Sequence, residues 1–157
     1  MGASRRWRVR QATPQDRAFL EQIAPRLTIG VAPWIDQDQM LKTMRGYLLF
    51  DLEKMDDNST VFIAIDDDDK AVGVATVNSN FHFTEEPQAH LGELAVAEEV
   101  EGQGVGGALL DAVEQWAREQ GLSWVALDTG SRNTRAREFY ARHGYGEESV
   151  RLVKSLT

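Results

Sequence analysis

The amino-acid sequence contains no cysteine among its 157 residues. This absence excludes disulfide bonds, thiolate metal ligands and any covalent intermediate formed on a cysteine. Histidine is also scarce, and its three positions, His82, His90 and His143, lack the spacing of metal ligands. We therefore predict that the protein has no metal site.

Long hydrophobic runs are missing as well. No apolar stretch approaches the roughly 18 residues that a membrane-spanning helix needs. The first six residues lack the apolar stretch of a signal peptide, and Arg6 occupies the position where a myristoylation signal has Ser or Thr. These features predict a cytoplasmic protein with no membrane partner.

Positive charge is in the minority. The chain has 17 Lys and Arg against 25 Asp and Glu, which gives a net charge of −8. An acidic surface repels phosphate backbones and attracts cations. The composition therefore argues against nucleic acid as a partner and is compatible with an amine substrate.

The rest of the composition is that of an ordinary globular domain, with 42% hydrophobic and 27% charged residues. The length fits one domain with one core, and no internal repeat or linker interrupts the sequence. We expect a single domain over residues 1–157.

The first sixty residues predict one strand and two helices. Residues 7–10 alternate as a short strand does. Thr13 and Pro14 begin a helix that ends or kinks at Pro25, and residues 36–54 form a second helix. The apolar faces of the two helices are expected to consist of Phe19, Leu20, Ile23, Ala24 and of Met40, Met44, Tyr47, Leu48.

Three strands are predicted next, over residues 61–65, 71–77 and 90–96. The acidic residues 66–69 lie between the first two strands, and Asp is a good turn former, so we expect a solvated hairpin turn rather than a calcium loop. Residues 78–87 are expected to form a longer connection.

The remainder alternates helices and strands. A helix is predicted over residues 105–120, a strand over residues 124–127 and a last helix over residues 133–144. One or two closing strands are expected from Tyr145 onward, ending at residues 150–153. The order β-α-α-β-β-β-α-β-α-β indicates a mixed α/β fold.

Four glycines lie between residues 102 and 107, where a predicted strand gives way to a helix. Glycine lets the chain turn sharply, and the amide N–H groups of the turn and of the helix start point at one ligand. The positive end of the helix dipole adds to their attraction for an anion. The pattern favours a phosphate or diphosphate ligand.

Two familiar phosphate-binding motifs fit this turn poorly. A P-loop needs Gly-Lys followed by Ser or Thr, which Gly106-Gly107-Ala108 does not supply. Gly102, Gly104 and Gly107 match the dinucleotide pattern GxGxxG, but residues 97–101 separate them from the preceding strand. In a dinucleotide fold the glycine turn follows its strand at once.

Two stretches resemble the hallmarks of the GCN5-related N-acetyltransferases (GNAT). Leu94-Ala95-Val96-Ala97-Glu98-Glu99-Val100-Glu101-Gly102-Gln103-Gly104-Val105-Gly106 resembles a strand followed by Arg/Gln-x-x-Gly-x-Gly/Ala, and it departs at Glu101, where the family has Arg or Gln. Asn133-Thr134-Arg135-Ala136-Arg137-Glu138-Phe139-Tyr140-Ala141-Arg142-His143-Gly144-Tyr145 resembles Asn-x-x-Ala-x-x-Phe-Tyr-x-x-x-Gly-Phe/Tyr. The resemblance covers about residues 61–153.

The resemblance implies a GNAT fold, in which a central mixed, mostly antiparallel sheet is flanked by about four helices. It implies acetyl-CoA as cofactor and a primary amine of a small molecule or peptide as acceptor. With no cysteine available, the acetyl group would pass by direct attack in a ternary complex. The cofactor-binding residues that the two motifs imply are Leu94, Ala95, Val96, Glu101, Gly102, Gln103, Gly104, Val105, Gly106, Gly107, Asn133, Ala136, Phe139 and Tyr140.

Catalytic roles are implied for three side chains. Tyr140 matches the tyrosine that the family uses as general acid toward the departing thiolate. An amine is mostly protonated at neutral pH, so a base or a water relay is expected to help its attack. Family members use an acid from either of two strands, which leaves Glu93 and Asp128 as candidates, with water alone as the remaining alternative.

The acceptor pocket is expected between the second helix, the loop before it and residues 78–87. Its candidate lining residues are Trp34, Asp36, Tyr47, Phe81 and Phe83. An exposed strand edge is compatible with a homodimer. Two alternatives stay open: a non-catalytic coenzyme A-binding regulatory module of the same fold, and a dinucleotide-binding oxidoreductase.

Overall fold

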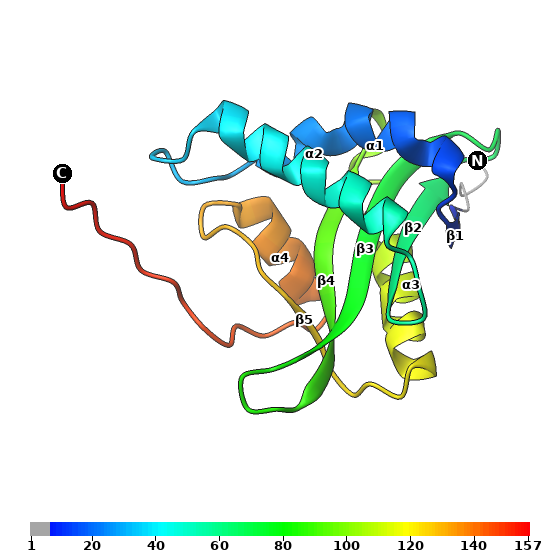
Figure 1. The fold of residues 1–157 in the computed structure, drawn as a ribbon. Coiled ribbons are helices and arrows are strands. Elements are labelled where there is room, and N and C mark those ends of the chain that lie inside the picture. Colours follow the sequence, from blue (N-terminus) through cyan, green and yellow to red (C-terminus); the bar gives the residue numbers. More distant parts are fainter. Residues whose placement is uncertain (1–6) are drawn as a thin grey trace.

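A five-stranded sheet in the order β1-β2-β3-β4-β5 forms the centre of the computed structural model, which describes residues 7–157 (Figure 1). Neighbouring strands are antiparallel from β1 to β4, whereas β5 runs parallel to β4. The predicted mixed, mostly antiparallel sheet is therefore confirmed. The strands are β1 (Arg8–Gln11), β2 (Ser59–Ile65), β3 (Ala71–Phe81), β4 (Pro87–Val96) and β5 (Val125–Leu127).

Within residues 7–157, four α-helices cover the sheet, α1 and α2 on one face and α3 with α4 on the other (Figure 1). They are α1 (Arg17–Ile23), α2 (Gln37–Glu53), α3 (Val105–Glu119) and α4 (Thr134–Arg142). Short 3-10 turns lie at η1 (Pro14–Asp16), η2 (Ala24–Thr28) and η3 (Glu98–Val100). Within residues 7–157, no helix has both the length and the apolar composition needed to cross a membrane.

The alternation of side chains along β2 divides the core into two layers. Val61, Ile63 and Ile65 pack in the cluster beneath α1 and α2, and Ala64 belongs to the cluster beneath α3. Successive residues of a strand point to opposite faces of the sheet, so an almost continuous apolar run can fill both layers at once. This is why β2 reads as an unbroken hydrophobic stretch.

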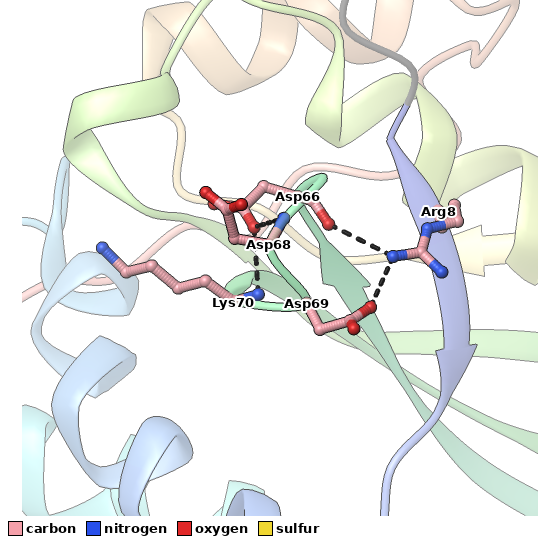
Figure 2. A network of polar contacts seen from close by, with 5 residues as sticks. All are labelled: Arg8, Asp66, Asp68, Asp69 and Lys70. Atoms are coloured by element: carbon pink, nitrogen blue, oxygen red, sulfur yellow. Dashed lines mark hydrogen bonds and ion pairs between the residues drawn. The ribbon is translucent and has the colours of Figure 1, made fainter.

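The acidic run between β2 and β3 forms the predicted hairpin turn (Figure 2). The Asp66 carboxylate accepts hydrogen bonds from the backbone N–H groups of Asp68, at 2.8 Å, and of Lys70, at 3.0 Å. Asp69 adopts a left-handed conformation with φ of 61° and pairs with Arg8 of β1. The turn is thus fastened to the neighbouring edge strand.

Strand β3 is longer than the sequence indicates, and the predicted connection over residues 78–87 is wrong. Residues 78–81 pair in register with residues 87–90 of β4, which leaves a short turn between His82 and Glu86. This part of β3 is polar, and its strand conformation comes from backbone pairing across the hairpin rather than from apolar alternation.

The apolar face predicted for α2 is only partly correct. Leu48 is buried, but Tyr47 is 51% exposed. The helix packs on the sheet through Leu41, Leu48 and Leu52, which recur at helical spacing. The helix is therefore rotated so that Tyr47 faces away from the core.

The closing strands predicted after Tyr145 are also wrong. Among the described residues, none after α4 belongs to a strand, and the chain from 146 to 157 extends away from the body (Figure 1). Val150 and Leu152 are exposed. Strand propensity does not form a strand without a neighbouring backbone to pair with, and β5 ends after three residues.

An ion pair holds the start of the first helical segment against β1. Asp16 is almost fully buried, and its two carboxylate oxygens each accept a hydrogen bond of 2.8 Å from Arg10. The backbone N–H of Thr13 donates a third bond, of 2.7 Å. The hydrogen bonds from Arg10 outweigh the effect of burial and lower the pKa of Asp16.

We predict that Asp16→Asn lowers the free energy of unfolding by about 2–3 kcal/mol at pH 7. This loss is smaller than that for breaking a fully buried ion pair, because the Arg10 side chain is 40% exposed. The folded pKa is depressed, so this stabilisation is present above the pKa of the unfolded chain and is lost as the pH falls through the folded value. Urea unfolding at pH 7 and pH 3 should show the variant's deficit shrinking with acid. Asp111→Asn, on the exposed side of α3, is the control, and a deficit independent of pH would contradict the assignment.

Candidate functional site

A bulge in β4 determines which way the neighbouring side chains point. Ala75 of β3 pairs with Leu94 and Val77 pairs with Leu91, so Thr76 stands opposite two residues, Gly92 and Glu93. The extra residue bends the strand locally. The N–H of Glu93 donates to the Thr76 hydroxyl at 2.9 Å, and that hydroxyl donates to the Glu93 carboxylate at 2.5 Å.

Glycine is required at position 92 because a Cβ atom there would lie 2.7 Å from the Thr76 hydroxyl oxygen. Any larger residue would displace the hydroxyl that both donates to and accepts from Glu93. The bulge and the Thr76–Glu93 contact therefore depend on the same glycine.

Beyond the bulge, β4 and β5 separate. Their parallel pairing ends at Leu91 and Leu127, while β4 continues to Val96. The unpaired edge of β4 forms one wall of a cavity of about 350 Å³, which we call the α3–α4 pocket. Its lining residues are Arg26, Ile29, Leu94, Ala95, Val96, Glu101, Gly102, Gly104, Val105, Gly106, Gly107, Asn133, Arg135, Ala136, Phe139, Tyr140, Arg142 and His143.

The structure brings every predicted cofactor-binding residue to this pocket except Gln103. The carbonyl of Gln103 instead accepts a hydrogen bond of 2.7 Å from the indole N–H of Trp7. Gly102 and Gly104 have φ of 77° and 90°, which side chains other than glycine rarely adopt. Gly104 is the N-cap of α3, so the turn delivers the free N–H groups of that helix start to the pocket.

Helix α4 closes the other side of the α3–α4 pocket. Asn133 caps it by accepting the N–H of Ala136 at 3.2 Å, and its side-chain amide donates to the Ile29 carbonyl at 3.4 Å. Tyr140 lies one helical turn beyond Ala136, edge-on to Phe139 with ring centroids 5.1 Å apart. Burial raises the pKa of Tyr140 to about 12.

A second cavity lies on the other side of β4, between that strand, β3 and α2. It has a volume of about 860 Å³, and we call it the α2 pocket. The exposed aromatic rings of Tyr47 and Phe50 belong to its wall, as do Asp51, His90 and Glu93. Glu93 therefore opens into the α2 pocket, whereas Leu94 next to it lines the α3–α4 pocket.

Asp51 and Glu93 form a pair of carboxyl groups in the α2 pocket. Burial raises the pKa of Glu93 to about 7, against the lowering effect of the Thr76 hydrogen bond, and the charge of Asp51 raises it further. Burial likewise raises the pKa of Asp51, which is within hydrogen-bonding reach of Glu93 and Thr76. A carboxyl group with a pKa near neutrality is suited to take up a proton at physiological pH.

Sequence reasoning missed Asp51. Two signals pointed to it: it interrupts an apolar stretch of α2, and it lies four residues after Tyr47, on the same side of the helix. Its partnership with Glu93, however, joins α2 to β4, and nothing local in the sequence predicts that contact.

The other predicted residues lie outside these two walls. The Asp128 side chain is 97% exposed, with its carboxylate 3.5 Å from Nε2 of His90. Asp36 is the N-cap of α2, where it accepts the N–H of Gln39 at 2.7 Å. Trp34, Phe81 and Phe83 are exposed and line neither pocket, so Tyr47 alone of the predicted acceptor residues does so.

Comparison with known proteins gives consistent results. The acetyltransferase (GNAT) family matches residues 17–145. Over 149 residues the chain is 32% identical to an aminoglycoside N(6′)-acetyltransferase type 1 of Stenotrophomonas maltophilia, covering 92% of this chain and 89% of that protein. An aminoalkylphosphonate N-acetyltransferase of Salmonella typhimurium is 31% identical over 88 residues, 55% of this chain and 57% of that protein.

The same fold occurs in the solved structure of the aminoglycoside N-acetyltransferase AAC(6′)-Iy in complex with CoA. The two chains superpose with a TM-score of 0.71 at 21% identity, covering 100% of this chain and 99% of that one. At this identity the likeness establishes the shared fold.

Two substitutions beside Glu93 should move its pKa in opposite directions. Asp51→Asn removes a negative charge that raises the pKa, so we expect a fall of about one pH unit from about 7. Thr76→Val removes a hydrogen bond that stabilises the charged carboxylate, so we expect a rise. Carbon-13 titration of labelled glutamate measures both, with Glu93→Gln identifying the resonance. Shifts in the same direction would contradict the described pairing.

Proposed function

Because the chain belongs to the acetyltransferase (GNAT) family, we propose that it transfers the acetyl group of acetyl-CoA to the primary amine of a small molecule. The observation that carries this proposal is the shared wall between the two pockets. Residues 94–96 of β4 line the α3–α4 pocket, and Glu93 beside them lines the α2 pocket. A donor and an acceptor seated in these pockets would meet at the edge of β4 that β5 leaves unpaired beyond Leu91, as direct attack in a ternary complex requires. Family membership sets aside the dinucleotide-binding oxidoreductase.

The α3–α4 pocket suits coenzyme A in its chemistry. The free N–H groups at the start of α3 and the guanidinium groups of Arg26, Arg135 and Arg142 favour a diphosphate. The unpaired edge of β4 is suited to the amides of pantetheine, by strand-like pairing. When bound, acetyl-CoA supplies an activated acetyl thioester.

In the α2 pocket, Glu93 acts as the general base. An amine such as lysine has a pKa near 10.4 and is mostly cationic at neutral pH, so the carboxyl pair of Glu93 and Asp51 attracts it. A Glu93 pKa of about 7 leaves the carboxylate free to accept a proton from the attacking nitrogen. Asp128 is the weaker candidate, because its carboxylate is almost fully exposed beside His90.

Tyr140 acts as the general acid on the other side of the strand. Its pKa of about 12 keeps the phenol protonated across the pH range of an assay. The phenol is therefore protonated when negative charge develops on the sulfur, and it can give that proton to the departing thiolate and recover one from solvent. The arrangement needs no covalent intermediate, in keeping with the absence of cysteine.

The acceptor is a small-molecule amine in this proposal. The two relatives named above are acetyltransferases of aminoglycosides and of aminoalkylphosphonates, both of them small molecules. The α2 pocket has a volume typical of small-molecule sites, with the rings of Tyr47 and Phe50 beside the acidic pair. An amine carried on a ring or an alkyl body would find both an apolar surface and a negative end.

The proposal is tested first by binding and then by turnover. Acetyl-CoA should raise the melting temperature, and NAD should not. In a thiol-release assay against a panel of small amines, kcat/KM should rise with pH through about 7, and Glu93→Gln should abolish this rise.

Tyr140→Phe should reduce kcat by about 100-fold while leaving the Kd for coenzyme A unchanged. Binding without turnover of any amine would instead favour the non-catalytic coenzyme A-binding module.

The assignment of the α2 pocket to the acceptor can be tested at Gly46. This residue lies in the pocket wall within α2, and a Cβ atom built there meets nothing within 4 Å. We expect Gly46→Leu to raise KM for the amine by about tenfold, because its side chain fills the pocket, with KM for acetyl-CoA unchanged. Gly46→Ala is the matched control and should stabilise the helix by about 1 kcal/mol. An unchanged KM for the amine in the leucine variant would place the acceptor elsewhere.

A further inference from the structure

Glu101 occupies the position in the glycine turn where the family pattern has Arg or Gln. An acid beside a diphosphate should repel it, and on charge alone Glu101 should weaken coenzyme A binding. The structure places the acid in a different setting. One carboxylate oxygen, Oε1, lies 3.1 Å from Nη2 of Arg26 and 2.9 Å from Nη1 of Arg135.

This contact joins three segments that are far apart in the sequence. Arg26 lies in η2, Glu101 follows η3, and Arg135 lies in the first turn of α4. Arg26 also donates from Nε to the carbonyl of Val96, at 3.1 Å, which ties it to the end of β4. Nη2 of Arg135 lies 3.8 Å from the position that a Cβ atom of Gly102 would take. Both guanidinium groups are therefore held at the glycine turn.

Without the acid, these two cations would not stay together. Both contact the same oxygen atom, so the two guanidinium groups lie side by side and would repel each other if that oxygen were removed. The Arg26 and Glu101 side chains are only 23% and 30% exposed, so screening by water is incomplete. Arg135 is 67% exposed and would regain much of its rotamer freedom.

We propose that Glu101 is a positioning residue, which holds Arg26 and Arg135 so that they present N–H donors to the diphosphate of coenzyme A. The inference rests on the proposed use of acetyl-CoA. One carboxylate, that of Glu101, pairs with two guanidinium groups, so the three side chains together carry one net positive charge. A guanidinium group has more N–H donors than its contact with one oxygen uses, which leaves others for a phosphate. Glu101 thus strengthens cofactor binding although its own charge opposes it.

The sign of one substitution separates this proposal from simple repulsion. Glu101→Gln should weaken binding of coenzyme A, with Kd rising about threefold to tenfold in isothermal titration calorimetry. If the acid only repelled the diphosphate, the same change would lower Kd. Glu99→Gln is the matched control, because it also removes one negative charge close to the glycine turn. Glu99 lies in η3 and pairs with Lys70 at 3.6 Å instead of with the arginines. Its Kd should stay within about twofold of wild type.

Further variants show whether Glu101 acts through the arginines. In an Arg26→Gln/Arg135→Gln background, Glu101→Gln should no longer weaken binding. Glu101→Asp keeps the carboxylate and should bind more tightly than Glu101→Gln. In turnover, Glu101→Gln should raise KM for acetyl-CoA with kcat unchanged, and a purely structural role would not produce that split. Equal weakening in both backgrounds would overturn the proposal.

A second ligand tests which phosphate is involved. Dephospho-coenzyme A keeps the diphosphate and lacks the phosphate on the ribose, so the loss on Glu101→Gln should be the same for both ligands. A loss confined to coenzyme A would overturn the assignment to the diphosphate. Binding of coenzyme A to the wild-type protein separates failure of the proposed function from failure of this inference. If the wild-type protein does not bind coenzyme A, the proposed function fails; if it does, and Glu101→Gln binds as tightly or more tightly, only this inference fails.

Discussion

The contact between Thr76 and Glu93 is the constraint on which both pockets depend. One extra residue in β4 needs a partner for its freed N–H, and the Thr76 hydroxyl provides it while donating to the Glu93 carboxylate. The bulge turns Glu93 into the α2 pocket, and the strand beyond it runs on without β5 as a partner. The edge of residues 94–96 that β5 leaves unpaired and the half-buried acid thus adjoin the same irregularity in one strand.

The charge distribution follows this division. The chain carries a net charge of −8, yet Arg26, Arg135 and Arg142 all line the α3–α4 pocket, and Asp51 and Glu93 meet in the α2 pocket. An anionic cofactor would meet the guanidinium groups, and a cationic amine would meet the Asp51–Glu93 pair in a pocket whose wall also carries Lys42 and Lys54. This arrangement supports the proposed transfer more directly than either pocket does alone. It also explains how an acid can be tolerated at position 101, because two of those arginines surround it.

Features encoded by neighbouring residues could be predicted from the sequence, and features made by distant ones could not. The glycine turn before α3 and the start of α4 at Asn133 are local, and both are confirmed. The partnership of Asp51 with Glu93 and the ion pairs of Glu101 join different elements, so no local pattern reports them. The prediction of closing strands was wrong for the converse reason. The residues after Tyr145 have strand propensity, but among the described residues they have no neighbouring strand to pair with. The two motifs that resemble the family are contiguous and their residues line the α3–α4 pocket, whereas the residues that line the α2 pocket come from four separate elements and the loops between them.

In the proposed reaction, the two sides of β4 serve two different substrates. Titration of nitrogen-15-labelled protein with coenzyme A, followed by amide resonances, tests this division. We expect large shifts for the N–H groups of residues 94–96 and 102–107, and none for the part of α2 that lines the acceptor side, residues 46–51. Shifts confined to α2 and to the neighbourhood of Glu93, with residues 102–107 unmoved, would contradict it.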